Sequence, residues 1–129
     1  FMDKVYEQYP STQLYAHGKY VGLPSLPPQV GNSEAGHMNI GAGRVVEQDS
    51  VRINKSIDNG TFYRNPAFKE VIRHVKDNHS SLHIMGVVSA GMSPHSYNKH
   101  LYALLKLARK SKIKNIITKT IPKSRTTLN

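Results

Sequence analysis

The chain has 129 residues, of which 38% are apolar, enough for one hydrophobic core of ordinary domain size but not for two independent ones. It contains no cysteine, which excludes disulfide frameworks and thiolate metal sites. The net charge of +10 is unevenly spread: all eight Asp and Glu residues lie within residues 1–77, and nine Lys and Arg residues lie in the last 52. The C-terminal part should therefore attract anions.

The sequence lacks membrane and export signals. No apolar run approaches the roughly 20 residues needed to span a bilayer, and Phe1 to Lys4 do not follow the basic-then-apolar pattern of a signal peptide. These features predict a cytoplasmic protein.

The first third of the sequence predicts a helix, a short strand and a long loop. Apolar residues recur at helical spacing over residues 1–8, until Tyr9-Pro10 stops the helix. Residues 12–16 alternate apolar and polar side chains, which is typical of a strand. Residues 21–31 are too rich in proline and glycine for a regular element, so they lead as a loop into Ser33.

The rest of the sequence predicts alternating helices and strands. Helices are expected over residues 33–40, 50–58, 65–75 and 95–110, and strands over residues 82–88, of the buried type, and 113–121. This order favours an α/β fold with a parallel sheet covered by helices. Ligands of such sheets bind at the C-terminal ends of the strands, here at Ser89-Ala90-Gly91 and Lys123-Ser124-Arg125.

Ser33 is the leading candidate for chemistry. A hydroxyl at the start of a helix faces backbone N–H groups and the positive end of the helix dipole, which favours an alkoxide or a phosphate ester. The dipole contributes only about 1 kcal/mol or less, so activation of a serine also requires a base or a metal ion. The alternative interpretation is that Ser33 only caps the helix.

A longer pattern surrounds this serine. Residues 31–46 read Gly-Asn-Ser-Glu-Ala-Gly-His-Met-Asn-Ile-Gly-Ala-Gly-Arg-Val-Val, and this stretch resembles the serine segment of cofactor-independent phosphoglycerate mutases. The likeness continues upstream and downstream, through Val21-Gly22-Leu23-Pro24 and Asn65-Pro66-Ala67. It implies that residues 1–47 are part of an alkaline-phosphatase-like domain and that residues 48–129 begin an inserted α/β transferase domain.

The resemblance also implies an activity and site residues. Ser33 would be both the nucleophile and a ligand of two manganese ions, and it would be phosphorylated transiently while 3-phosphoglycerate and 2-phosphoglycerate interconvert in glycolysis and gluconeogenesis. His95 and Arg125 would contact the phosphoglycerate. The family resemblance further implies a monomeric enzyme.

The sequence departs from the family at two places. Ser89-Ala90-Gly91-Met92-Ser93-Pro94 replaces the family's Asp-Gly-Gly turn and is one residue longer, and Thr126 stands where the family has an aspartate that orients the hydroxyls of the substrate. The family's metal ligands come mainly from segments outside this chain, so the chain alone is expected to be an inactive fragment. Two alternatives remain open: a non-catalytic remnant that binds phosphorylated anions through His95, Lys123 and Arg125, and a basic nucleic-acid binder built on residues 109–119.

Overall fold

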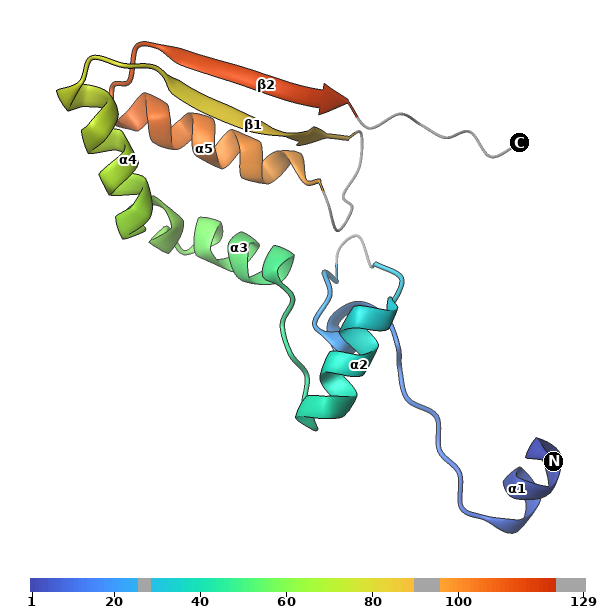
Figure 1. The fold of residues 1–129 in the computed structure, drawn as a ribbon. Coiled ribbons are helices and arrows are strands. Elements are labelled where there is room, and N and C mark those ends of the chain that lie inside the picture. Colours follow the sequence, from blue (N-terminus) through green and yellow to red (C-terminus); the bar gives the residue numbers. More distant parts are fainter. Residues whose placement is uncertain (26–28, 90–95, 123–129) are drawn as a thin grey trace. The chain divides into compact units, whose positions relative to one another are not determined.

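The computed structural model describes residues 1–25, 29–89 and 96–122 of the chain (Figure 1). The chain forms two compact units, Phe1–Glu47 and Gln48–Asn129. In the described residues, no helix combines the length and the apolar character that a membrane crossing would need.

The described residues of the first unit form two α-helices and one 3-10 helix. These are α1 (Met2–Gln8), η1 (Gly18–Val21) and α2 (Ser33–Ala42). The helix predicted before Tyr9-Pro10 is confirmed, and Tyr9 leaves it in an extended conformation, as the residue before a proline usually does. The strand predicted over residues 12–16 is wrong. A strand needs a partner for its backbone, and this segment instead leaves Leu14 83% exposed without regular hydrogen bonding.

A small apolar cluster holds the loop before α2 against that helix. Val21 and Leu23 from the loop bury their side chains with Ala35 of α2, which is completely inaccessible to solvent. The helix ends at Gly43, whose positive φ of 62° is the left-handed conformation that glycine adopts most easily. The predicted helix start at residue 33 is therefore confirmed, and the helix continues to Ala42.

The second unit begins with three consecutive helical segments. They are α3 (Asp49–Asp58), η2 (Thr61–Arg64) and α4 (Pro66–Asp77), which confirm the helices predicted over residues 50–58 and 65–75. Asn65 caps α4 because its Oδ1 accepts a hydrogen bond of 2.9 Å from the Ala67 N–H, and Pro66 occupies the first helical turn.

The rest of the second unit is a parallel β-α-β arrangement. β1 (Leu82–Val88) pairs with β2 (Ile116–Pro122), and α5 (Asn98–Lys110) makes the crossover between them (Figure 1). The predicted α/β class and the parallel pairing of these two strands are confirmed. The helix expected from residue 95 begins later, at Asn98, because Tyr97 is extended with φ −145°.

The expectation that β1 is buried on both faces is wrong for the described part of the chain. Ile84 points toward the α5 side and is buried, whereas Met85, on the opposite face, is 75% exposed. The apolar run predicts a strand with two covered faces, but α5 lies on one side of the two-stranded sheet (Figure 1).

Two helices end with non-glycine residues in the left-handed conformation. His79 follows α4 with φ 49°, and Lys112 follows α5 with φ 57°. Both ends are Schellman motifs, in which the next N–H reaches back to a carbonyl five residues earlier: Ser80 to Val75 at 3.0 Å, and Ile113 to Ala108 at 3.1 Å. Each left-handed side chain carries a steric cost that glycine would not.

We expect Lys112→Gly to raise the free energy of unfolding by about 1 kcal/mol, because it relieves the left-handed strain at the end of α5. Urea unfolding followed by far-ultraviolet circular dichroism measures the change. Lys114→Gly is the matched control. It removes the same charge close by, at a residue without positive φ, and should not stabilise the chain. Equal effects of the two substitutions would contradict the backbone explanation.

Candidate functional site

Ser33 is the first residue of α2 and its side chain is exposed. The capping position belongs to Asn32, whose Oδ1 accepts a hydrogen bond of 2.8 Å from the Ala35 N–H. The interpretation of Ser33 as the helix cap is therefore wrong, because its neighbour performs that role. The Ser33 hydroxyl is left at the positive end of a ten-residue helix without a capping duty.

His37 lies one turn further along α2 and contacts Ser33 twice. Its Nδ1 is 2.8 Å from the Ser33 carbonyl oxygen and 3.4 Å from the Ser33 hydroxyl oxygen. A carbonyl oxygen can only accept, so the shorter contact requires a hydrogen on Nδ1. That nitrogen then has no lone pair to take the hydroxyl proton. In this arrangement His37 does not serve Ser33 as a general base through Nδ1.

Asn39 holds the surroundings of α2 in place, a role that the sequence did not reveal. Its Nδ2 donates to the Val21 carbonyl at 3.1 Å, and its Oδ1 accepts from the Val46 N–H at 2.7 Å. One side chain thus joins α2 to the loop before it and to the segment after it. Asn39 lies inside the serine pattern, which was the available signal, but its partners are 18 and 7 residues away.

Two glycines allow the backbone to pass closely near this helix. A Cβ on Gly22 would lie 1.8 Å from the Val46 carbonyl oxygen, and Gly22 also has a positive φ of 72°. A Cβ on Gly31 would lie 1.6 Å from the Ala16 carbonyl oxygen. The loop that delivers Ser33 therefore depends on glycine at both positions.

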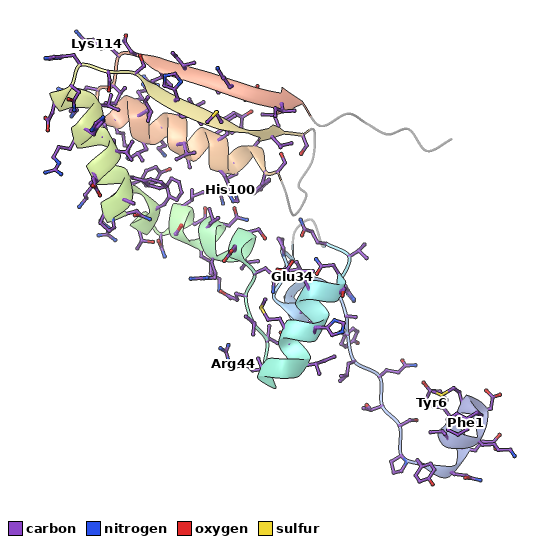
Figure 2. The ribbon with its side chains drawn as sticks, viewed as in Figure 1. Phe1, Tyr6, Glu34, Arg44, His100 and Lys114 are labelled. Atoms are coloured by element: carbon purple, nitrogen blue, oxygen red, sulfur yellow. The ribbon has the colours of Figure 1, made fainter. Side chains whose placement is uncertain are left out.

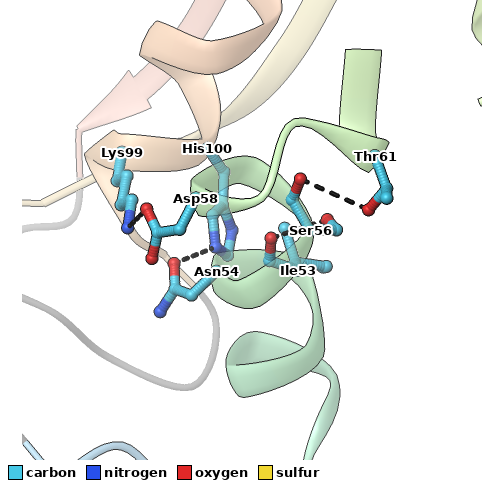
Figure 3. Close-up of polar contacts among 7 residues, drawn as sticks. All are labelled: Ile53, Asn54, Ser56, Asp58, Thr61, Lys99 and His100. Carbon is cyan, nitrogen blue, oxygen red and sulfur yellow. Dashed lines mark hydrogen bonds and ion pairs between the residues drawn. The ribbon is translucent and has the colours of Figure 1, made fainter. Parts of the chain in front are cut away.

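The second unit contains a cavity of about 250 Å³ lined by residues of α3, β1 and α5. His100 of α5 lies at its wall, and its Nε2 is 3.1 Å from Asn54 Oδ1 of α3 (Figure 3). Beside it, Lys99 Nζ lies 2.6 Å from Asp58 Oδ1. The pKa of His100 is lowered from its ordinary value of 6.5, first by burial and then by the charge of Lys99.

The hydrogen bond between His100 and Asn54 links helices α5 and α3. Asn54 Oδ1 can only accept, so Nε2 carries a hydrogen and donates it to this oxygen. The contacts join residues 46 and 41 positions apart, so helical spacing alone cannot reveal them. Because burial disfavours the charged ring, the neutral form with its hydrogen on Nε2 is the favoured form of His100.

We expect His100 to make the second unit less stable in mild acid. Its folded pKa lies below the unfolded value, so the unfolded chain binds the proton more readily and the stabilisation is fully present above pH 6.5. It is lost as the pH falls below 6.5 through the folded pKa. His100→Gln should therefore lose less of its urea midpoint between pH 7.5 and pH 5.5 than the parent chain does. His83→Gln, on an exposed strand position, is the control and should keep the parent's pH dependence.

The other two predicted site residues, His95 and Arg125, lie outside the described residues, as do Ala90 and Thr126. At the C-terminal end of β1, two carbonyls accept hydrogen bonds from side chains at or just before the start of α5. Ser96 Oγ donates to the Val87 carbonyl at 2.8 Å, and Asn98 Nδ2 donates to the Ser89 carbonyl at 2.9 Å. The roles of His95 and Arg125 therefore stay predictions.

The residues around Ser33 do not fit a two-manganese centre by themselves. Manganese prefers several carboxylate, imidazole and water ligands. Within residues 1–25, 29–89 and 96–122, no three His, Asp or Glu side chains group as a metal site. Ser33 contributes a single hydroxyl oxygen, so the described residues around it do not form a complete manganese site.

Comparison with known proteins supports the family resemblance that the sequence suggests. A family model described as the BPG-independent PGAM N-terminus matches residues 53–128. The 2,3-bisphosphoglycerate-independent phosphoglycerate mutases of Staphylococcus epidermidis and Staphylococcus saprophyticus are each 53% identical over 114 residues, and that of Staphylococcus aureus is 51% identical over the same length. These matches cover 88% of this chain but only 22% of each relative. The chain therefore spans about a fifth of the length of the curated relatives it matches.

Proposed function

Because this chain belongs to the family of BPG-independent phosphoglycerate mutases, we propose that it carries the serine through which that family moves a phosphoryl group between the 3- and 2-hydroxyls of glycerate. The observation that supports this role is the position of Ser33, exposed at the start of α2 with the capping function taken by Asn32. A phosphate ester there would face the free N–H groups of the first helical turn.

The proposed phosphoryl transfer takes place in two steps, first to Ser33 and then from it. The hydroxyl oxygen forms a bond to phosphorus while the bond between phosphorus and the glycerate oxygen breaks, and a proton passes to the released hydroxyl. The reverse step places the phosphoryl group on the other hydroxyl and restores the serine. The first step needs a group that removes the Ser33 proton, and the second needs one that takes the proton of the attacking glycerate hydroxyl while the serine oxygen regains a proton. His37 Nδ1 already donates to a carbonyl, so it cannot accept the Ser33 proton.

The chain by itself is therefore proposed to lack turnover. A helix dipole contributes about 1 kcal/mol or less, which is far too little to ionise a serine hydroxyl near neutral pH. In the proposal, residues 1–47 belong to the phosphatase-type domain with its manganese, and residues 48–129 to the transferase domain. His95 and Arg125 contact the phosphoglycerate there, in a cytoplasmic monomer.

Hybrid enzymes test this proposal. In the Staphylococcus epidermidis relative, the matching segment is replaced by residues 1–47 of this chain in one hybrid and by residues 48–129 in another. The first should retain turnover of 3-phosphoglycerate, followed by phosphorus NMR. The second should be weaker, because residues 89–94 lack the aspartate of the family's turn and Thr126 replaces another aspartate of the family pattern.

The isolated 129-residue chain, assayed with manganese, should show no turnover. Turnover by the isolated chain, or a folded but inactive first hybrid, would contradict the proposal. Calorimetry of the isolated chain with 3-phosphoglycerate separates a remnant that still binds from one that is inert.

A further inference from the structure

A second polar pocket lies at the edge of the sheet where both strands begin. It has a volume of about 270 Å³ and is formed where α4 and α5 end and β1 and β2 start, an end of the unit marked by Lys114 in Figure 2. Its lining comprises Val75, Lys76, His79, Ser80, Lys112, Ile113, Lys114 and Asn115. Since β1 and β2 are parallel, this edge is opposite the C-terminal strand ends where the sequence predicts substrate.

The pocket concentrates positive charge. Lys76, Lys112 and Lys114 line it together with His79, and no carboxylate is among the lining residues. Elsewhere in the same unit, Asp49 pairs with Arg52 and Asp58 pairs with Lys99. In the described part of the chain, none of the three pocket lysines forms such an ion pair.

The negative ends of the two helix dipoles are too weak to neutralise the charge of the three lysines. Cations stabilise the negative end of a helix, and two helices end at the pocket. Each helix end is equivalent to about half a negative charge, so the two together offset about one of the three lysine charges. The terminal carbonyls also have partners already, through the Ser80 and Ile113 N–H groups. A surplus of about two positive charges remains at the pocket.

Neutral polar groups at the pocket add hydrogen-bonding capacity. Ser80 presents a hydroxyl and Asn115 a side-chain amide, while their backbone groups are used in the fold: the Ser80 N–H by Val75 and the Asn115 carbonyl by Leu82. The volume lies just below the roughly 300–1,000 Å³ of pockets for drug-sized ligands. The pocket therefore suits a compact anion.

We propose that this pocket binds a small anion that carries two phosphoryl groups, at a site separate from Ser33 and from the C-terminal edge of the sheet. The three lysines supply charge-assisted contacts to the phosphoryl oxygens, and Ser80 and Asn115 supply neutral donors. This inference goes beyond the proposed function, which needs no ligand at the opposite edge. A single-stranded nucleic acid fits less well, because no Phe, Tyr or Trp side chain for base stacking lines the pocket.

Titration of the 129-residue chain with inorganic pyrophosphate in 150 mM KCl tests the proposal, with amide NMR as the readout. We expect the amides of residues 75–80 and 112–115 to shift, with a Kd below about 1 mM. Lys76→Gln and Lys114→Gln should each weaken binding roughly fivefold or more. Lys106→Gln is the matched control. It removes a lysine of α5 that lies over the Tyr63 ring and not in the pocket, and it should leave the Kd within twofold.

A variant that should remain folded distinguishes a loss of binding from a loss of folding. Lys112→Gly relieves a left-handed residue and removes one pocket charge, so it should bind pyrophosphate more weakly while remaining folded. Equal binding by all lysine variants, binding that disappears at 150 mM KCl, or preferential binding of a single-stranded oligonucleotide would overturn the proposal. Ser33→Ala should bind pyrophosphate normally, so failure at this pocket is distinguishable from failure of the proposed mutase role.

Discussion

Replacing Ser33 with alanine is expected to lower kcat by about 10³-fold or more in the hybrid enzyme that carries residues 1–47. The substitution removes the oxygen that accepts the phosphoryl group and leaves the helix intact, because Asn32, and not Ser33, caps α2. The loss should therefore appear in kcat without a fall in the melting temperature. Rates of 2-phosphoglycerate formation measured by phosphorus NMR give the result.

Ser11→Ala is the matched control for this experiment. Ser11 is an exposed serine of the same unit, outside any helix or strand, and its removal should leave kcat unchanged. Mass spectrometry of the acid-quenched hybrid provides a second readout: phosphate should be found on Ser33 and be absent from the alanine variant. Turnover by Ser33→Ala within tenfold of the parent hybrid would rule out the nucleophilic role.

Gly22→Ala is expected to destabilise the first unit by about 3 kcal/mol. The new Cβ would lie 1.8 Å from the Val46 carbonyl oxygen, and the residue would keep a left-handed φ of 72° that alanine adopts poorly. The backbone would have to move away from the small cluster of Val21, Leu23 and Ala35. Exchange of the Ala35 amide, which is bonded to Asn32, should accelerate roughly 100-fold.

Gly36→Ala makes the same chemical change as Gly22→Ala but is expected to have the opposite effect on stability. Gly36 lies within α2, and nothing stands within 4 Å of the Cβ it would gain. Alanine is the better helix former, so the substitution should stabilise the unit by about 1 kcal/mol. If both alanine variants changed stability alike, the close approach at Gly22 would not be the cause.

Local signals in the sequence predicted most of the helices. Asn65-Pro66 begins α4 because the cap and the fixed proline φ act within one turn, and Gly43 ends α2 for an equally local reason. Alternation alone failed over residues 12–16, because strand formation depends on a partner that adjacent residues cannot supply. The late start of α5 likewise follows from Tyr97, whose extended conformation no periodicity reveals.

The sequence by itself determined the family, the serine at a helix start and the excess of positive charge in the C-terminal part, because each is a property of composition or of a contiguous pattern. The structure decided which of these side chains already have hydrogen-bond partners. It gave the cap to Asn32, turned His37 Nδ1 toward a carbonyl, and joined His100 to Asn54. It also gathered three lysines at one edge of the sheet, since two helix ends separated by more than 30 residues meet there. The Asn32 cap and the His37 contact are local to α2, whereas the His100 contact and the lysine cluster depend on interactions between distant segments, which one-dimensional spacing does not contain.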